Sequence, residues 1–365
     1  MKYKEMKLGD VAEINMGQSP NSKYFNSDGK GIEFLQGIRT FGENYPSFDT
    51  YTTQYNKISE KGDILFSVRA PVGKINWSDR KIAIGRGLAA LKVLPNFSSK
   101  YVYYFLKKIG SQINSISSGT VFSSINKKEL ANVKILIPDS LKDQEYIGTR
   151  LALLDKKIEL NNRINDNLDS LLTTIFHKEV NNTNFSKANL TDIANYRNGL
   201  AMQKYRPKSN EKSLPVLKIK ELNQGFTDSS SDRCSSEINE DFIVKTGDII
   251  FSWSGTLLVK NWSGTIAGLN QHLFKVTSKK YPNWFIYEWT KYHLNKFQTI
   301  ASGKATTMGH IKRSDLKESR VYIPSERKLN KLNTLMKPIY DKRIEIIREN
   351  QQLTYIKQIL LQKYF

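Results

Sequence analysis

The chain has 365 residues and carries 56 Lys and Arg against 35 Asp and Glu. The resulting net charge of +21 attracts polyanions or anionic membranes. A membrane is the weaker alternative, because the sequence contains no apolar run of about 20 residues and no signal peptide. The single cysteine, Cys234, excludes a disulfide framework and a zinc cluster within one chain. We therefore expect a cytoplasmic protein that binds a polyanion.

The predicted elements, in chain order, fall into two similar halves. Residues 1–140 show short apolar runs separated by Gly, Pro, Asn and Ser, which predicts a strand-rich domain with one helix over Ser99–Ile109. Residues 141–182 are typical of one long helix. Residues 183–325 repeat the first layout, with a helix around Trp284–Trp289, and residues 326–365 predict a second long helix.

The repetition is explicit in the sequence. The block Gly-Asp-Ile-Leu-Phe-Ser at 62–67 returns as Gly-Asp-Ile-Ile-Phe-Ser at 247–252. Ser-Gly at 118–119 and Ile-Pro at 137–138 return in the same order about 185 residues later, and Asp-Lys-Lys-Ile-Glu at 155–159 returns as Asp-Lys-Arg-Ile-Glu at 341–345. This period is too long for a solenoid of short repeats. A duplicated unit of domain size predicts an approximate two-fold axis, which is the backbone symmetry of duplex DNA.

Both long helices carry a heptad seam, which is apolar at its ends and polar in its middle. The predicted seam residues are Ile147, Leu151, Leu154, Ile158, Asn161, Asn165, Leu168, Leu172 and Ile175 in the first helix, and Tyr340, Ile344, Ile347, Gln351 and Leu361 in the second. Since the order is domain, helix, domain, helix, the second helix most simply returns antiparallel to the first. The alternative is two unrelated surface helices, each packed on its own domain. Pro338 is expected to mark the first turn of the second helix or a kink.

Catalytic signatures are not found in the sequence. It has no Pro-Pro or Pro-Cys motif of a DNA methyltransferase and no phosphate loop with Gly-Lys-Ser/Thr. Gly85-Arg86-Gly87 indicates a turn beside DNA or a bulge rather than a dinucleotide loop. Pro138-Asp139 followed by Asp155-Lys156-Lys157 imitates a nuclease signature, but its second acid falls on a predicted helix instead of an adjoining strand. The histidines His177, His272, His293 and His310 are scattered, and structural roles are expected for them.

Taken together, these doubled blocks resemble the specificity subunit of type I restriction–modification systems. The resemblance rests on three pairs of blocks, each copy of the set leading into a long helix: 62–67 and 247–252, 118–120 and 302–304, and 135–138 and 321–324. The resemblance covers nearly the whole chain. It implies an α+β protein with two pseudo-symmetric, strand-rich target recognition domains, separated by two long helices that form an antiparallel coiled coil. Each domain is expected to read one half of a split DNA target, while the helices fix the gap and dock the partners.

The resemblance also implies that catalysis lies elsewhere. Two modification subunits are expected to bring S-adenosylmethionine and to methylate adenine, and restriction subunits are expected to bring ATP- and Mg²⁺-dependent translocation and nuclease activity. Three alternatives stay open at this point. The chain could be a stand-alone DNA-binding protein, such as a repressor or architectural factor, or a fused enzyme whose catalytic motif is too divergent to recognise. It could also be the specificity subunit of a methylation-only or single-chain-nuclease system.

Loops are the expected readers of DNA, because the strands must form the cores, and side chains that reach base edges or phosphates determine specificity and affinity. The candidates in the first domain are Gln18, Ser19, Lys23, Arg39, Arg69, Arg86, Thr120, Ser123 and Ser124. Those in the second are Lys204, Arg206, Lys218, Lys220, Asn270, Gln271, Lys304, Thr306 and Thr307. Because the domains differ most in these loops, they are expected to read different half-sites.

Overall fold

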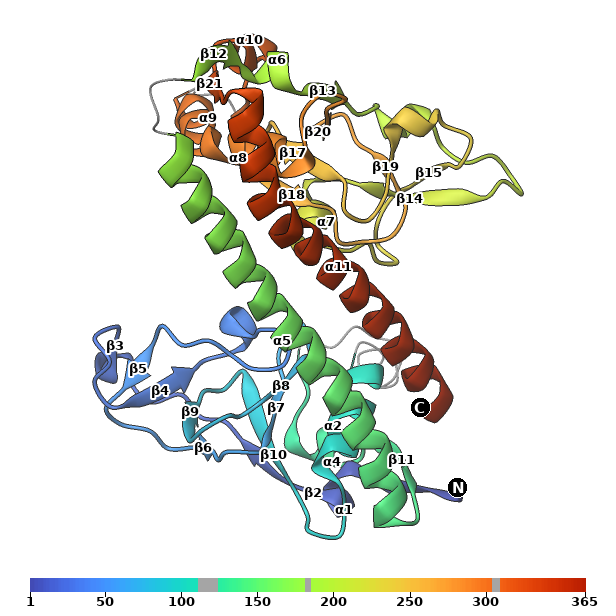
Figure 1. The fold of residues 1–365 in the computed structure, drawn as a ribbon. Helices are drawn as coiled ribbons and strands as arrows, with labels where there is room; N and C mark the ends of the chain where they lie inside the picture. Colours follow the sequence, from blue (N-terminus) through green and yellow to red (C-terminus); the bar gives the residue numbers. More distant parts are fainter. Residues whose placement is uncertain (111–123, 181–184, 304–308) are drawn as a thin grey trace. The chain divides into compact units, whose positions relative to one another are not determined.

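The computed structural model describes residues 1–110, 124–180, 185–303 and 309–365, which form two compact units (Figure 1). Unit 1 comprises Met1–Lys156 with the C-terminal segment Ile356–Phe365, and unit 2 comprises Lys157–Tyr355. Two long helices, α5 (Leu141–Val180) and α11 (Glu326–Tyr364), each contribute residues to both units.

Unit 1 consists of short strands with a few helices. Its strands are β1 Tyr3–Lys7, β2 Ala12–Met16, β3 Phe25–Asn26, β4 Ile32–Leu35, β5 Tyr51–Thr52, β6 Ile58–Ser59, β7 Ile64–Ser67, β8 Ile75–Trp77, β9 Ile82–Ile84, β10 Leu88–Val93 and β11 Lys134–Pro138. Its further helices are α1 Leu8–Val11, α2 Ser99–Ile109 and α4 Lys127–Ala131, with 3₁₀ turns η1 Ser22–Tyr24 and η2 Ile38–Thr40.

Unit 2 has a similar, though not identical, set of strands and helices. Its strands are β12 Ser186–Asn189, β13 Asn195–Asn198, β14 Ser213–Leu217, β15 Arg233–Ser235, β16 Ile243–Val244, β17 Ile249–Ser252, β18 Leu258–Asn261, β19 Ala267–Leu269, β20 Leu273–Thr277 and β21 Arg320–Ile323. Its further helices are α6 Leu190–Ile193, α7 Ile219–Gln224, α8 Asn283–Tyr292, α9 Leu294–Ser302 and α10 Arg313–Lys317, with 3₁₀ turns η3 Met202–Lys204 and η4 Glu240–Phe242.

The duplication seen in the sequence is present in the sheet topology. Unit 1 has a four-stranded sheet in the order β2-β10-β7-β8, and unit 2 has one in the order β13-β20-β17-β18. A second sheet in each unit contains a parallel pair, β4 with β9 and β14 with β19. The first and last strands of each repeat also pair, β1 with β11 and β12 with β21. The expected α+β architecture of two strand-rich repeats is thereby confirmed.

The repeated Gly-Asp block forms a tight turn before β7 and β17. Gly62 and Gly247 have φ values of +93° and +97°, a left-handed conformation that L side chains rarely adopt. The carboxylate of Asp63 accepts a hydrogen bond from the Glu60 amide at 2.8 Å, and that of Asp248 accepts one from the Lys245 amide at 2.9 Å. Gly and Asp therefore recur because the same turn requires the glycine and uses the carboxylate to satisfy a backbone donor.

Each unit builds its core around one amphipathic helix. In unit 1, Tyr101–Leu106 of α2 are buried and pack with Ile147 and Leu151 of α5, with Leu361 of α11 and with Phe365, the residue after α11. Ser98 caps α2, with its side chain accepting from the Tyr101 amide. In unit 2, Trp284–Trp289 of α8 pack with residues of both α5 and α11. Burial of each large apolar side chain contributes roughly 1.5–3 kcal/mol to the stability of the fold. The long helices α5 and α11 are therefore part of the core of each unit.

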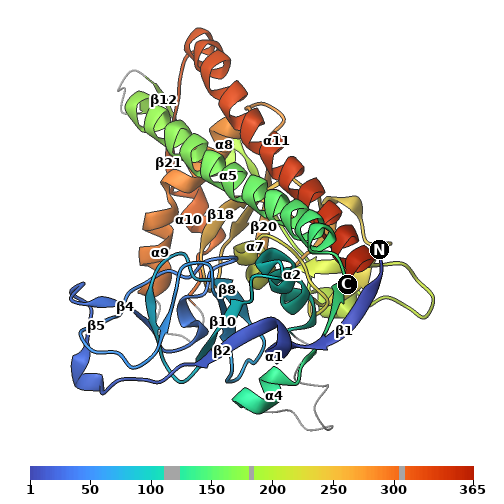
Figure 2. The same ribbon diagram turned by 90° about the horizontal axis from the view of Figure 1, so that it is seen from below.

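The α5 and α11 helices run antiparallel, as expected from the chain order. In unit 2 they lie side by side (Figures 1 and 2), and the Arg343 guanidinium contacts Asp169 at 2.8 Å. In unit 1 Lys357 of α11 contacts Asp155 of α5. The contact residue therefore moves forward along α11, from 343 to 357, as it moves back along α5, from 169 to 155. The α11 helix begins at Glu326 and continues through Pro338, and the alternative that Pro338 marks its first turn is therefore wrong.

The middle of the helix pair is polar, as the seam pattern indicates. Asn161 is 1% exposed, and its amide donates to the Glu349 carboxylate at 2.7 Å and to the Asn350 side chain at 2.8 Å. Asn350 in turn donates to Asn162 at 2.8 Å. A buried amide that finds its partners in only one register penalises slipped pairings. The apolar ends therefore supply stability, while this asparagine cluster defines the register.

A partly buried charged cluster joins α5, α8 and α11 within unit 2. The Asp169 carboxylate accepts hydrogen bonds from Lys291 and from the Tyr287 hydroxyl, in addition to its ion pair with Arg343. Arg343 is 7% exposed and lies over the Tyr287 ring at 5.0 Å. Glu288 is buried next to this cluster, and burial raises the pKa of its carboxyl to about 7. The cluster fixes the two long helices against α8.

Candidate nucleic-acid interface

Three loops of unit 1 meet at one edge of the sheet that contains β4 and β9. The two strands pair in parallel, with Leu35 opposite Ile84, so their carboxyl ends lie together. The amide of Gly85 donates to the Leu35 carbonyl at 2.8 Å, and the amide of Gln18 donates to the Ile84 carbonyl at 3.0 Å. The loops that follow β2, β4 and β9 therefore converge on the same edge.

Side chains from these three loops are linked to each other. The Ser19 hydroxyl donates to the Gln36 side-chain oxygen at 2.8 Å and accepts from the Arg86 amide at 3.1 Å. Gln18, Gln36 and Arg86 are exposed. The structure thus brings together the three predicted residues Gln18, Ser19 and Arg86. It adds Gln36, which the sequence reasoning missed.

A fourth loop adjoins this edge. The Val68 amide donates to the Gly87 carbonyl at 3.0 Å, and Arg69 forms an isolated β-bridge with Ser124. The predicted residues Arg69 and Ser124 therefore lie next to the loop that carries Arg86. Thr120 and Ser123 fall outside the described residues.

The other two candidates of the first domain have partners of their own. Arg39 forms a bidentate ion pair with Asp49, with N–O distances of 2.7 and 2.6 Å. The Arg39 hydrogen bonds hold the pKa of the Asp49 carboxyl below its ordinary value, which indicates that the pair stays charged and matched. Lys23 is exposed, and its ammonium lies 5.0 Å from the centre of the Tyr24 ring. Among the residues that the structure describes, neither Arg39 nor Lys23 forms a hydrogen bond or ion pair with the Gln18–Arg86 edge.

The equivalent edge of unit 2 is hollowed into a cavity of about 860 Å³. It collects the predicted residues Arg206, Lys218, Lys220, Asn270 and Gln271, and it adds four polar residues that were not predicted, Gln203, Asp232, Arg233 and His272. Lys204 is exposed on η3 and does not line the cavity. Lys304, Thr306 and Thr307 fall outside the described residues.

The cavity is basic, but its cations are not equivalent. Lys218 pairs with Asp232 and holds the pKa of that carboxyl below its ordinary value. The Lys220 ammonium donates to the Ser230 hydroxyl at 2.8 Å. Arg206 is exposed and forms no ion pair with any residue that the structure describes. Arg206 is therefore the cation that is most available to a phosphate or a base.

Two residues of the cavity wall have structural roles in addition to their position. Asn270 is 6% exposed, and its side-chain oxygen accepts from the His272 amide at 3.3 Å. The Nδ1 atom of His272 lies 3.0 Å from the Ser254 hydroxyl. Asn270 thus shapes the loop more than it faces a ligand.

Aligning the two repeats by their strands would have found Gln36, since it follows β4 as Lys218 follows β14.

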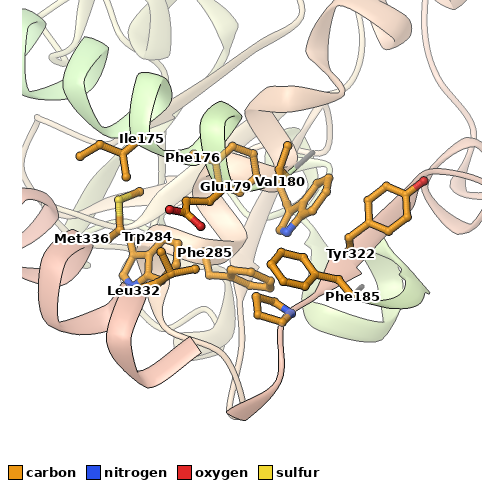
Figure 3. Close-up of a pocket in the computed structure, with 12 residues that line it drawn as sticks. Ile175, Phe176, Glu179, Val180, Phe185, Trp284, Phe285, Tyr322, Leu332 and Met336 are labelled. Carbon is orange, nitrogen blue, oxygen red and sulfur yellow. The ribbon is translucent and has the colours of Figure 1, made fainter. Parts of the chain in front are cut away.

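A second, much smaller cavity of unit 2 is lined mainly by aromatic and aliphatic side chains. Figure 3 shows side chains such as Phe176, Phe285 and Phe185 facing one another around it. Its volume is about 20 Å³, room for about one water molecule.

Across residues 1–110, 124–180, 185–303 and 309–365 there is no group of three or more His, Cys, Asp or Glu residues that could hold a metal ion. Within the same ranges, no helix has the length and hydropathy needed to cross a membrane.

Comparisons with known proteins agree on one family. The family model described as type I restriction modification DNA specificity domain matches residues 1–170 and again 182–355. A specificity subunit of the type I restriction enzyme MjaX from Methanocaldococcus jannaschii is 37% identical over 185 residues, which cover 46% of this chain and 43% of the relative. The MjaIX specificity subunit of the same organism is 24% identical over 398 aligned positions, covering 97% of this chain and 89% of the relative.

One solved structure has the same fold. The crystal structure of a type I restriction-modification system S subunit from M. genitalium matches with a TM-score of 0.60 at 17% identity. The match covers 100% of this chain and 96% of that chain. The alignment with the MjaX relative spans less than half of that protein's length, whereas the other two span nearly all of theirs.

Proposed function

The chain belongs to the type I restriction modification DNA specificity family, and from this premise we propose how its two repeats divide the recognition of DNA. Each repeat reads one half of a bipartite target with the loops at the ends of its parallel strand pair. The observation that carries this proposal is the recurrence of the same loop edge in both units, with polar and basic side chains exposed on it. The loop residues differ between the repeats, so the half-sites differ.

The chain is a specificity subunit, and we propose that methylation and cleavage belong to its partners. Modification subunits supply S-adenosylmethionine and methylate adenine, while restriction subunits supply ATP- and Mg²⁺-dependent translocation and nuclease activity. The helices α5 and α11 set the number of base pairs between the half-sites. The hydrogen bonds of the buried Asn161 to Glu349 and Asn350 support this role, because a ruler requires a single register.

A stripe of exposed apolar side chains on α5 supports the docking of a partner helix. It consists of Tyr146, Leu153, Leu160, Ile164 and Leu171, which are 42–63% exposed. At 100° per residue these five positions fall within about 40° of the helix circumference. They lie on a different face from the buried seam, which includes Leu151, Ile158 and Leu172. An apolar stripe of this spacing fits one further amphipathic helix, and we assign it to a modification subunit.

Deleting the gene tests the proposed function directly. In its own host, we expect one bipartite methylated motif to disappear on deletion and to return when the gene is restored. The purified chain alone should transfer no methyl group from labelled S-adenosylmethionine to DNA. An unchanged methylome would favour the stand-alone repressor alternative. If the motif depends on the gene but no restriction subunit co-purifies, the chain serves a methylation-only system.

Charged substitutions in the α5 stripe should separate docking from folding. The double variant Leu160→Asp, Ile164→Asp places two carboxylates on exposed positions, so the fold should be kept while binding of the modification subunit falls by at least tenfold, because the charges become buried and unpaired at the interface. Ser170→Asp adds a carboxylate to another exposed face of α5 and is the matched control. The measurement is co-purification together with circular dichroism. Equal partner binding by both variants would exclude the stripe as the docking surface.

A further inference from the structure

One position is equivalent in the two repeats down to its backbone hydrogen bonds. The connection from β9 to β10 is the three residues 85–87, and the connection from β19 to β20 is the three residues 270–272. Their middle residues are Arg86 and Gln271. Five backbone hydrogen bonds around the first of these positions each have a counterpart around the second. Written as amide donor to carbonyl acceptor, those of the first repeat are Gly17 to Leu88, Gln18 to Ile84, Gly85 to Leu35, Leu88 to Gly85 and Val68 to Gly87. In the same order, those of the second repeat are Gly199 to Leu273, Leu200 to Leu269, Asn270 to Leu217, Leu273 to Asn270 and Trp253 to His272.

The residues on either side of Arg86 and of Gln271 are held by close contacts, burial or hydrogen bonds. A Cβ atom on Gly85 would lie 2.6 Å from the Gln36 side-chain oxygen, and one on Gly87 would lie 2.5 Å from the Gln36 carbonyl oxygen. In the second repeat, Asn270 is buried and His272 is held by Ser254. The flanking residues therefore cannot vary freely. The middle side chain projects from a backbone that the hydrogen bonds hold in the same place in both repeats.

The two middle side chains are free to meet a ligand. Arg86 is exposed, and its guanidinium has no hydrogen-bond or ion-pair partner among the described residues. Gln271 lines the basic cavity, and its side-chain nitrogen has one long contact of 3.5 Å, to His272. An arginine that served stability would be expected to have a carboxylate or carbonyl partner, as Arg39 has in Asp49.

The chemistry of the two side chains differs in a way that matches two bases. Arginine donates two parallel hydrogen bonds to the O6 and N7 atoms of guanine in the major groove. Glutamine donates to N7 and accepts from N6 of adenine. We propose that position 86 of the first repeat and position 271 of the second are the same base-reading position, with Arg86 specifying a guanine in one half-site and Gln271 an adenine in the other. This inference rests on the proposed function and adds the residues that carry it.

Exchanging the two side chains is the test. In the complex assembled with its modification subunits, Arg86→Gln should replace one guanine by adenine in the half-site of the first repeat. Gln271→Arg should make the reverse change in the other half-site. The gap and all other positions should stay the same. Lys128→Gln removes a positive charge from an exposed position of α4 and should leave the motif unchanged. The readout is the methylated motif in a host that carries each variant.

Binding to synthetic duplexes keeps the test decisive if a variant complex does not methylate. Four duplexes that differ only at the assigned base pair are compared for each complex. The preference of the wild type for guanine over adenine should be about 5- to 150-fold, the range for one bidentate pair, and Arg86→Gln should reverse its direction. A uniform loss of affinity for all four duplexes, or an unchanged preference, would overturn the inference. Either result leaves the proposed function standing, which fails only if no motif depends on this gene.

Discussion

Replacing residues 1–140 with the corresponding segment of another specificity subunit is expected to change one half-site of the methylated sequence completely and to leave the other half-site and the gap intact. The physical reason is that all loops at the β4–β9 edge lie within this segment, whereas the α5 and α11 helices lie outside it. Each base pair lost from the original half-site should cost about 1–3 kcal/mol of binding, so recognition of the old sequence should vanish.

The donor segment must also fit the core that the helices complete. Tyr104 donates to Asp155 of α5 at 2.7 Å, and Tyr101 lies 5.0 Å from Phe365, the residue after α11, measured between ring centres. A donor with tyrosines at both positions is therefore the matched choice. Replacing residues 183–325 instead is the reciprocal control, and methylome sequencing is the measurement for both. If the first exchange altered both half-sites, reading would be shared between the repeats and the division proposed above would be wrong.

Asp169→Ala is expected to be the most destabilising single substitution in the charged cluster of unit 2. It removes the carboxylate that pairs with Arg343 and Lys291, and Arg343 is 7% exposed. Leaving a buried cation without its partner costs several kcal/mol. Because the Asp169 side chain is itself 27% exposed, we expect about 2–4 kcal/mol of lost unfolding free energy after solvent screening.

Tryptophan fluorescence during urea unfolding is a suitable measurement, because Trp253, Trp262, Trp284 and Trp289 lie in unit 2 and only Trp77 lies in unit 1. The control is Asp341→Ala, which removes a carboxylate on α11 whose Lys337 partner is more than half exposed and should cost about 0.5 kcal/mol or less. If both variants lost equally little unfolding free energy, the cluster would orient the helices without stabilising the fold.

The sequence predicts the helices of this protein better than the loop edge at the ends of its parallel strand pairs. The helix expected over Ser99–Ile109 coincides with α2, and the long helix expected from residue 141 is α5. These segments have a strong helical period and few breakers, so local information suffices. The first repeat's edge depends instead on a parallel pairing between β4 and β9, in which Leu35 pairs with Ile84, 49 residues further along the chain. No local pattern encodes such a contact.

The candidate readers show the same limit. Arg39 and Arg86 are both arginines in polar loops, and composition alone treats them alike. The structure pairs Arg39 with Asp49, ten residues further on, and leaves the Arg86 side chain exposed between two glycines. Gln36 was not a candidate, although it links Ser19 to the same edge. Whether a polar side chain in a loop has an internal partner depends on tertiary contacts, so a single sequence can nominate readers but cannot rank them.

The ion pairs between the long helices are not symmetric, although the repeats they join are. Asp155 and Asp169 come from α5, and the buried bases that meet them, Lys357 and Arg343, come from α11. The reversed pair, Lys157 with Glu349, is half exposed and therefore weak. Two copies of α5 brought together would bury acids without bases, and two copies of α11 would bury bases without acids. These ion pairs therefore favour the pairing of α5 with α11 over the pairing of either helix with a copy of itself.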